Sequence, residues 1–249
     1  MVGERGARWL EASLPARPSS KKRRFAETGV RFVMHALVLG YGVWATWGEP
    51  WMGQTRLCWQ DLPFHILTGR IWWYYMLELG FYCSMILAVR LDVRRKDFWM
   101  HVLHHFVVVV LLAGSWTLNI TRLGSLILLV HDAADPILML AKLFHYLGKT
   151  RLCIGVYILF TAVWLYSRVY YFPVQIVFIS TREKLFCDSG RWRGNIPTWV
   201  LLLLLYFLLC LHVIWTYLIL QALVVSVVRK KPLEDRRSDA SDADGDKED

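Results

Sequence analysis

The stretch HVLHHFVVVVLL (residues 101–112) and the later stretch LLVHDAADPILML (residues 128–140) place polar side chains inside long apolar runs. Four of them fall where lipid would be the natural neighbour of a side chain: His104, His105, Asp132 and Asp135. An Asp at the centre of a membrane-spanning helix costs about 2.5–3.5 kcal/mol on insertion scales, so such residues normally face a bundle interior or a water-filled cavity. The two stretches therefore predict membrane helices that carry a functional site.

The composition supports this interpretation over the whole chain. Of the 249 residues, 56% are hydrophobic and 20% are charged, and the apolar residues come in runs close to the 20 or so that span a bilayer. An all-α integral membrane protein is predicted, because lipid leaves the backbone no partners outside the helix itself. Six spans are predicted, at residues 28–47, 71–88, 99–118, 123–147, 152–179 and 197–228, and the fifth is long enough to tilt or to break at Pro173.

The spans divide the chain into a basic segment (1–27), a transmembrane domain (28–228) and an acidic tail (229–249) that is expected to be disordered. Basic residues gather in the loops of one side, at 21–24, 90–96, 149–151 and 229–231. Cytosolic loops carry such an excess, so both termini are predicted to be cytosolic. The net charge of +9 then reflects topology, and we expect no nucleic-acid partner. Ser238 and Ser241 in the tail are candidate phosphorylation sites, unless the tail serves only solubility.

The polar groups of the third and fourth spans are expected to meet. Three imidazoles, spaced three and four residues apart, line one stripe near the cytosolic end of the third span: His101, His104 and His105. In the fourth span, Asp132 and Asp135 share a helix face, and His131 neighbours Asp135. A short loop separates the two spans, so we expect antiparallel neighbours whose stripes converge in the cytosolic half of the membrane. Such a site would perform acid–base or nucleophilic chemistry in an enzyme, or bind ions or protons in a transporter.

Two other interpretations of these residues are weaker. The Asp pair could instead have a structural role, through ion pairs with Arg122 or Lys142, but this leaves the imidazoles unexplained. The HxxHH spacing matches a His box of the membrane desaturases, whose di-iron sites need several boxes, and the remaining histidines form no second box. No metal or other cofactor is therefore predicted.

The five cysteines form no CxxC pair, and a disulfide between Cys58 and Cys187 is a hypothesis.

The run DVRRKDFWMHVLHHF (92–106), followed by SWTLNITRLGSLILLVHDAADPILMLAK (115–142), closely resembles the signature region of the ceramide synthases, which belong to the TLC family. The similarity extends along most of the chain and includes WWYYMLELGFY (72–82) and RVYYFP (168–173). The resemblance implies a TLC-type helical bundle or barrel around a lipid cavity in the endoplasmic reticulum membrane. It implies transfer of a fatty acyl group from acyl-CoA, the co-substrate, to the amine of a sphingoid base, giving ceramide or dihydroceramide.

The resemblance also assigns residues. The family's essential groups fall on four catalytic candidates: His104, His105, Asp132 and Asp135. Further signature positions are candidate substrate-binding residues: Asn119, Arg122, His131 and Lys142. The loop at about Thr181–Pro197 is expected to influence the acyl chain length. The chain departs from the family at Met139, where members commonly carry Glu, and Pro136 is expected to kink its helix. Around Ala16–Arg24 there is a remnant of a homeobox-like segment.

Making an amide from a thioester requires that the amine lose a proton, that the oxyanion be stabilised and that water be excluded. Histidine accepts a proton at neutral pH, and it can take the acyl group as an acyl-imidazole. Of His104 and His105, one is expected to be the nucleophile and the other the general base, with Asp132 and Asp135 orienting them. Direct transfer without an acyl-enzyme stays open, as does the question of whether the basic loop at 90–96 binds CoA phosphates or only sets topology.

The expected partners are fatty acyl-CoA, a sphingoid base, lipids of the endoplasmic reticulum membrane and, in a dimer, a second copy or a related synthase. The alternative function is that of a non-catalytic TLC-type lipid sensor or regulatory protein. Met139 favours this alternative, whereas the retained pair of histidines argues against it.

Overall fold

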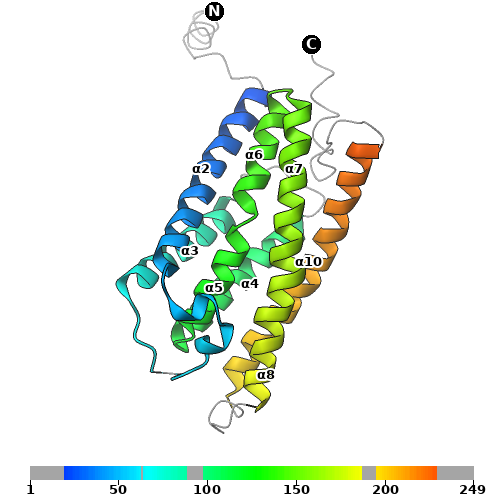
Figure 1. Cartoon of the computed structure of the whole chain (residues 1–249). Helices are drawn as coiled ribbons and strands as arrows, with labels where there is room; N and C mark the ends of the chain where they lie inside the picture. Colours follow the sequence, from blue (N-terminus) through cyan, green and yellow to red (C-terminus); the bar gives the residue numbers. More distant parts are fainter. Residues whose placement is uncertain (1–19, 63, 89–97, 187–194, 229–249) are drawn as a thin grey trace, which may run out of the picture.

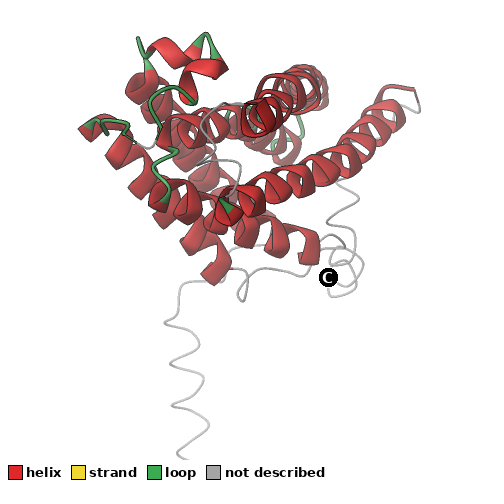
Figure 2. Ribbon diagram, turned by 90° about the horizontal axis from the view of Figure 1, so that it is seen from below, coloured by secondary structure: helices red, strands yellow, loops and turns green. Residues whose placement is uncertain are grey.

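The computed structural model describes residues 20–62, 64–88, 98–186 and 195–228. Within these residues the regular elements are all helical and no strand occurs (Figures 1 and 2). The apolar runs become helices because only hydrogen bonds within the segment satisfy a backbone in lipid. The long elements are α2 (Ser20–Thr46), α3 (Gly69–Ala88), α4 (Phe98–Thr117), α5 (Thr121–Asp132), α6 (Asp135–Tyr146), α7 (Thr150–Trp164), the π-helical segment η3 (Leu165–Phe178), α8 (Ile179–Phe186) and α10 (Ile196–Val228).

Each predicted span has a helical counterpart, and four helical stretches in the described chain are long and apolar enough to cross a membrane. They are Phe98–Thr117, Thr121–Tyr146, Thr150–Phe186 and Ile196–Ser226, with mean hydropathies of 1.7, 1.6, 1.7 and 2.3. The helices α2 and α3 are not among them, so the count of six spans stays a prediction. The helix that contains the predicted fifth span continues beyond Ile179 to Phe186.

The helices pack as a bundle in which α2 begins and α10 ends at the same end of the molecule (Figure 1). Neighbouring helices pack in the order α2, α3, α4, α10, α7 and α6, and α6 packs back on α2. The helix α5 contacts α2, α3, α4 and η3. Residues of α5 are therefore surrounded by helices from most of the chain.

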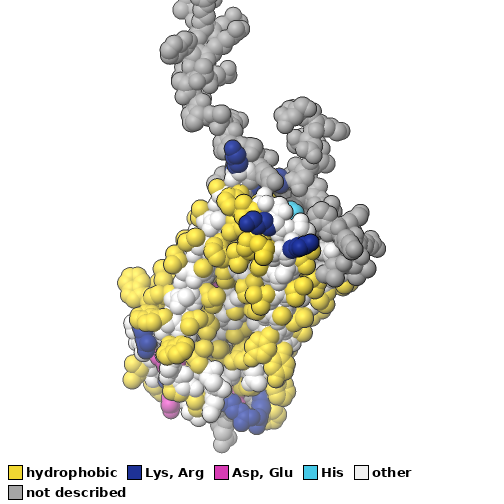
Figure 3. All heavy atoms as spheres, turned by 45° about the horizontal axis from the view of Figure 1, so that its top comes forward, with side chains coloured by type: hydrophobic (Ala, Val, Ile, Leu, Met, Phe, Trp, Pro, Cys, Tyr) yellow, Lys and Arg dark blue, Asp and Glu magenta, His cyan; other side chains and the backbone are white. Residues whose placement is uncertain are grey.

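The outer surface has the character of a membrane protein. Figure 3 shows a face covered by hydrophobic side chains over its middle, with Lys and Arg near its two ends. Many large apolar side chains point outward, among them Trp47, Phe106, Leu203 and Val213, each more than half exposed. Exposed apolar surface on this scale marks contact with lipid or with another protein.

Two prolines affect the helices differently. The stretch Thr121–Tyr146 breaks between Asp132 and Asp135, where Pro136 has no N–H to offer the carbonyl of Asp132. The kink predicted at Pro136 is thus confirmed. Pro173 instead lies inside η3, where the helix widens to π-helical turns without interruption. Such widened turns are frequent at functional sites, and this one carries the buried Arg168.

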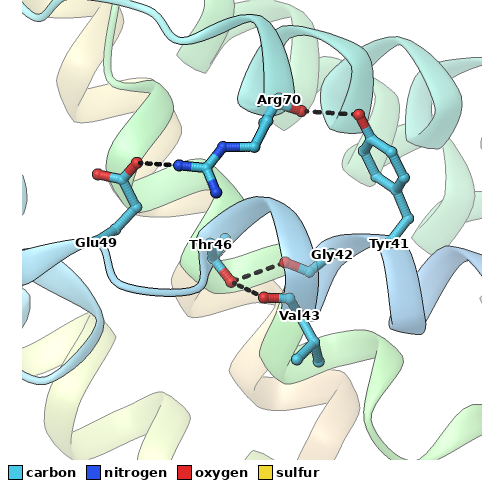
Figure 4. A network of polar contacts seen from close by, with 6 residues as sticks. All are labelled: Tyr41, Gly42, Val43, Thr46, Glu49 and Arg70. Atoms are coloured by element: carbon cyan, nitrogen blue, oxygen red, sulfur yellow. Dashed lines mark hydrogen bonds and ion pairs between the residues drawn. The ribbon is translucent and has the colours of Figure 1, made fainter.

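Polar contacts join the end of α2 to the start of α3 (Figure 4). The Tyr41 hydroxyl donates to the carbonyl of Arg70 over 3.4 Å, and the Arg70 guanidinium lies 3.8 Å from a Glu49 carboxyl oxygen. The Thr46 hydroxyl donates to the carbonyl of Gly42, one turn earlier, over 2.7 Å. These contacts fix the exit of α2 and thereby the path of the connection to α3.

The α2–α3 connection contains two short 3-10 turns, η1 (Pro50–Met52) and η2 (Thr55–Cys58). Burial raises the pKa of the Cys58 thiol to about 12, and burial lowers the pKa of His65. The Cys58–Cys187 disulfide hypothesis remains untested because Cys187 lies outside the described residues, as do Ser238 and Ser241 of the tail and the basic loop at 90–96.

Candidate functional site

The predicted stripe of imidazoles exists on α4. His104 and His105 are 9% and 8% exposed, and their ring centroids lie 5.4 Å apart. Trp215 of α10 packs against this stripe, with its ring 5.2 Å from that of His104 and 5.3 Å from that of His101. The Nδ1 atoms of His104 and His105 are buried and make no hydrogen bond with any described residue. Packing therefore holds the two rings, and these two ring nitrogens have no hydrogen-bond partner among the described residues.

Acidic side chains gather at the break between α5 and α6. Asp132, which is 3% exposed, accepts a 2.9 Å hydrogen bond from the Tyr74 hydroxyl of α3. Glu78, one turn further along α3, is completely buried and interacts with both Tyr74 and Asp132. The Asp135 side chain is 30% exposed, and one of its carboxyl oxygens lies 4.0 Å from Nδ1 of His35 on α2. Three helices thus supply one buried acidic cluster.

The imidazoles and the acids are neighbours without direct hydrogen bonds. None of the hydrogen bonds found among the described residues joins His104 or His105 to Asp132 or Asp135. Tyr82 of α3 lies between the groups, with its ring 5.7 Å from that of His105 and its hydroxyl close enough to Asp132 to interact electrostatically. The two stripes therefore share Tyr82 as a neighbour, and a direct orienting role of the carboxylates stays a prediction.

A buried cation completes the site. Arg168 of η3 donates one N–H to the carbonyl of His131, in the last turn of α5 before the break, and a second N–H points at Nε2 of His212 over 3.2 Å. The His131 and His212 rings lie 5.0 Å apart. Carbonyls at a helix end need partners other than the helix itself, and Arg168 supplies one here. Its charge also interacts with Asp132 and Asp135, so it offsets part of the negative charge of the acids.

An apolar pocket runs away from this polar cluster. It is bounded by α4, α5, α8 and α10 and holds about 770 Å³ of unfilled space when its mouth is included. Tyr82 and His131 line it at the polar cluster, and Val108 lines it one turn beyond His104. The rest of the wall is mostly leucine and isoleucine: Leu111, Leu112, Ile120, Leu123, Ile127, Leu128, Leu201, Leu202, Leu205 and Leu208. Apolar pockets with a few polar groups at one end are typical of ligand sites.

The far end of the pocket is formed by Ser180, Lys184 and Thr198. The Lys184 ammonium donates to the Thr198 hydroxyl and, over 3.2 Å, to the carbonyl of Asn195, and it lies 5.2 Å from the centre of the Trp199 ring. Along α10, Thr198 and Leu208 are ten residues apart, which corresponds to about 15 Å at 1.5 Å per residue. The pocket is thus long and apolar, with polar groups at both ends.

The model of one protein family, described as the TLC domain, matches residues 24–221. The chain belongs to the TLC domain family. Similar family members include ceramide synthase 5 of Mus musculus, 37% identical over 217 residues, which are 87% of this chain and 51% of the relative. Ceramide synthase 4 of Mus musculus is 34% identical over 95% of this chain and 59% of its own length. Ceramide synthase hyl-1 of Caenorhabditis elegans is 33% identical over 81% of this chain and 57% of its own. The chain therefore spans between half and three fifths of these relatives.

In this TLC domain, three of the predicted site residues lie apart from the polar cluster. Asn119 forms the turn between α4 and α5 with a positive φ of 53°, which asparagine tolerates, and its amide donates to the carbonyl of His65 over 3.1 Å. Arg122 donates to the carbonyl of Leu57 over 3.3 Å. Lys142 lies two turns beyond Asp135 on α6. The observed contacts of Asn119 and Arg122 tie the helix turn to the α2–α3 connection, and a role of these three residues in substrate binding stays a prediction.

The TLC domain brings together His104, His105, His131 and Asp132, with Asp135 at the edge. Sequence reasoning missed several of their neighbours: His35, Tyr74, Glu78, Arg168 and His212. A signal existed for Glu78 and Arg168, since each is a charged residue inside a predicted span. Among the described residues, no three His, Cys, Asp or Glu side chains lie together in a way that could hold a metal ion.

Proposed function

We propose that this protein transfers a fatty acyl group from acyl-CoA to the amine of a sphingoid base, forming ceramide or dihydroceramide. The observation that carries the proposal is the buried His104–His105 pair, whose neighbour Tyr82 lines one end of a long apolar pocket. The apolar lining of this pocket suits a hydrocarbon chain, and the imidazoles would supply the chemistry near its end. The similarity to ceramide synthases supports the choice of thioester and amine.

The reaction joins R–CO–S–CoA and R′–NH₃⁺ into R–CO–NH–R′, CoA–SH and one released proton. The carbon–sulfur bond breaks and a carbon–nitrogen bond forms. In the proposed site, His104 or His105 acts as the nucleophile or the general base, using a nitrogen that no protein group occupies. A site closed to water protects a reactive acyl intermediate from hydrolysis.

The neighbouring groups would control charge. Asp132, held by the Tyr74 hydroxyl, offers negative charge close to the imidazoles, which favours a positively charged imidazolium or the ammonium of the base. Arg168 keeps the acids from repelling one another and fixes the end of α5, from which Asp132 projects. Replacing Asp132 or Arg168 is therefore expected to change the geometry of the acidic cluster more than that of the pocket.

The proposed setting is the endoplasmic reticulum membrane, with six spans arranged as a barrel and both termini cytosolic. In this orientation the His end of the pocket lies in the cytosolic half, where CoA arrives, and the acyl chain points toward Lys184. Fatty acyl-CoA and the sphingoid base are the proposed substrates. Dimerisation with a second copy or a related synthase is part of the same proposal.

The test is expression in cells that lack ceramide synthase activity, supplied with labelled sphingoid base and fatty acid. The wild-type chain is expected to restore labelled ceramide, and His104→Ala is expected to abolish it at equal membrane abundance. His145→Ala is a matched control, because this imidazole lies in the last turn of α6, away from the cluster. Absence of product from the wild-type chain, with retained binding of the sphingoid base, would favour the lipid-sensor function instead.

A further inference from the structure

Two walls of the apolar pocket approach each other closely at Gly114 of α4 and Leu201 of α10. A Cβ added at Gly114 would lie 2.6 Å from Cδ2 of Leu201 and 3.4 Å from its Cδ1, and the shorter distance is one that real Cβ atoms essentially never show. Leu201 is a lining residue of the pocket, and so is Ser115, which follows Gly114. The missing side chain at position 114 therefore lets Leu201 lie back against α4.

This close approach lies toward the far end of the pocket. Along α4, Gly114 is ten residues beyond His104, which corresponds to about 15 Å at 1.5 Å per residue. Along α10, Leu201 is one turn from Thr198, which lines the polar far end. An acyl group whose carbonyl lies at the His pair would therefore reach Leu201 only with the distal part of its hydrocarbon chain.

We propose that the contact between Gly114 and Leu201 sets the longest acyl chain that the pocket accepts, an inference that rests on the proposed function and concerns its specificity. A methyl group at position 114 would displace the Cδ atoms of Leu201, which are the flexible end of that side chain, and Leu201 borders the unfilled space of the pocket. The displaced side chain would occupy volume that the end of a long acyl chain needs. A shorter acyl chain ends before this point and keeps its place.

The polar end wall gives a long acyl chain no alternative space. Beyond Leu201 the pocket is lined by Ser180, Lys184 and Thr198, and the Lys184 ammonium donates to the Thr198 hydroxyl. The methyl end of an acyl chain cannot replace such a hydrogen bond, and a buried polar group that loses its partner costs free energy. The predicted influence of the loop at 181–197 would act at this wall, whereas the proposed contact acts one turn before it.

The experiment measures kcat/KM of the purified protein in lipid nanodiscs, with a sphingoid base and a series of saturated acyl-CoAs of increasing length. Gly114→Ala is expected to lose about tenfold or more with the longest acyl-CoA that the wild type uses, because one methylene too many in an apolar pocket costs about 10–200-fold. It is expected to keep the wild-type value with shorter ones. Leu201→Ala is expected to extend the accepted range to longer acyl chains. The double variant lacks the group that the new Cβ would strike, so it is expected to behave like Leu201→Ala.

Two matched controls are expected to keep the wild-type range of acyl chains. Gly80→Ala adds a Cβ on α3 that meets nothing within 4 Å, and Leu203→Ala shortens a side chain of α10 that is 66% exposed. A purely structural effect of Gly114→Ala would lower the activity with every acyl-CoA alike, and this result overturns the inference, as does an unchanged range for Leu201→Ala. If Gly114→Ala does not fold, the range of Leu201→Ala alone decides. A wild-type protein that forms no ceramide from any acyl-CoA would instead refute the proposed function, so the two failures are distinguishable.

Discussion

Replacing Gly124 by alanine tests the packing of three helices beside the pocket. A Cβ at Gly124 of α5 would overlap the hydroxyl of Tyr75 on α3 and would lie 3.0 Å from the Ser115 hydroxyl on α4. Tyr75 is 1% exposed, and its hydroxyl makes 3.2 Å hydrogen bonds with Ser115 and with the carbonyl of Thr121. The Tyr75 ring therefore has to move, and both hydrogen bonds are disturbed when it does.

The expected size follows from opposing effects. Overpacking a core costs about 1–3 kcal/mol, and each lost hydrogen bond costs about 0.5–1.5 kcal/mol. The better helix propensity of alanine returns about 1 kcal/mol. Gly124→Ala is therefore expected to destabilise the protein by about 3 kcal/mol, which lowers Tm by about 6–12 °C for a chain of this size. The measurement is thermal unfolding of the purified protein in detergent.

The matched control is Gly155→Ala on α7, where an added Cβ meets nothing within 4 Å. This variant is expected to be neutral or slightly stabilising. In addition, Tyr75→Phe removes the hydroxyl that clashes, so Gly124→Ala combined with Tyr75→Phe should lose less than the sum of the single changes. Equal Tm values for Gly124→Ala and Gly155→Ala would refute the close approach of α3 and α5.

Three further predictions concern the site and the α2–α3 connection. Tyr74→Phe removes a hydrogen bond to Asp132 and is expected to lower kcat for ceramide formation about tenfold, because a bond to a charged group contributes about 1.5–3 kcal/mol; an unchanged kcat would contradict this. Arg168→Met leaves the acids without their buried cation and is expected to lower the free energy of unfolding by about 3–5 kcal/mol. The loss is measured by size-exclusion chromatography after heating, and an elution profile like that of the wild type would contradict the prediction. Burial holds the Cys58 pKa at about 12, so the folded protein keeps this thiol proton between about pH 9 and 12 whereas the unfolded chain loses it, and stability falls as pH rises through that range. Alkylation of Cys58 should accordingly be slow in the folded protein up to pH 9, as followed by peptide mass spectrometry, and rapid labelling without unfolding would count against its burial.

The positions of the helices were predictable from the sequence because the apolar runs are flanked by charged loops. In lipid, the backbone of such a run can satisfy its hydrogen bonds only by forming a helix. The kink at Pro136 followed from its missing N–H. The packing of α4, which carries the His104–His105 pair, against α5, which carries Asp132, was predictable as well, since a short turn makes the two helices neighbours. These features depend on local sequence, which a single chain displays directly.

Contacts between distant segments were not predictable in this way. Arg168 reaches the end of α5 from a helix more than thirty residues away, and no local pattern specifies this approach. Asn119 and Arg122 were grouped with the site by resemblance, yet they lie at the opposite end of α5 from Asp132, about 15 Å away at 1.5 Å per residue. The helix continues through Pro173 because its turns widen there, and no residue pattern in the sequence predicts this widening.

The central claim is that the acyl chain lies in the pocket between α4, α5 and α10, with its carbonyl at the His pair. The most direct measurement uses an acyl-CoA whose chain ends in a photoreactive diazirine, followed by mass spectrometric mapping of the labelled residues. Labels are expected on pocket-lining residues such as Leu112 and Leu205, and not on Leu203, which is 66% exposed on the outer face of α10. Labelling of Leu203 and other outward residues, with none in the pocket, would contradict the account.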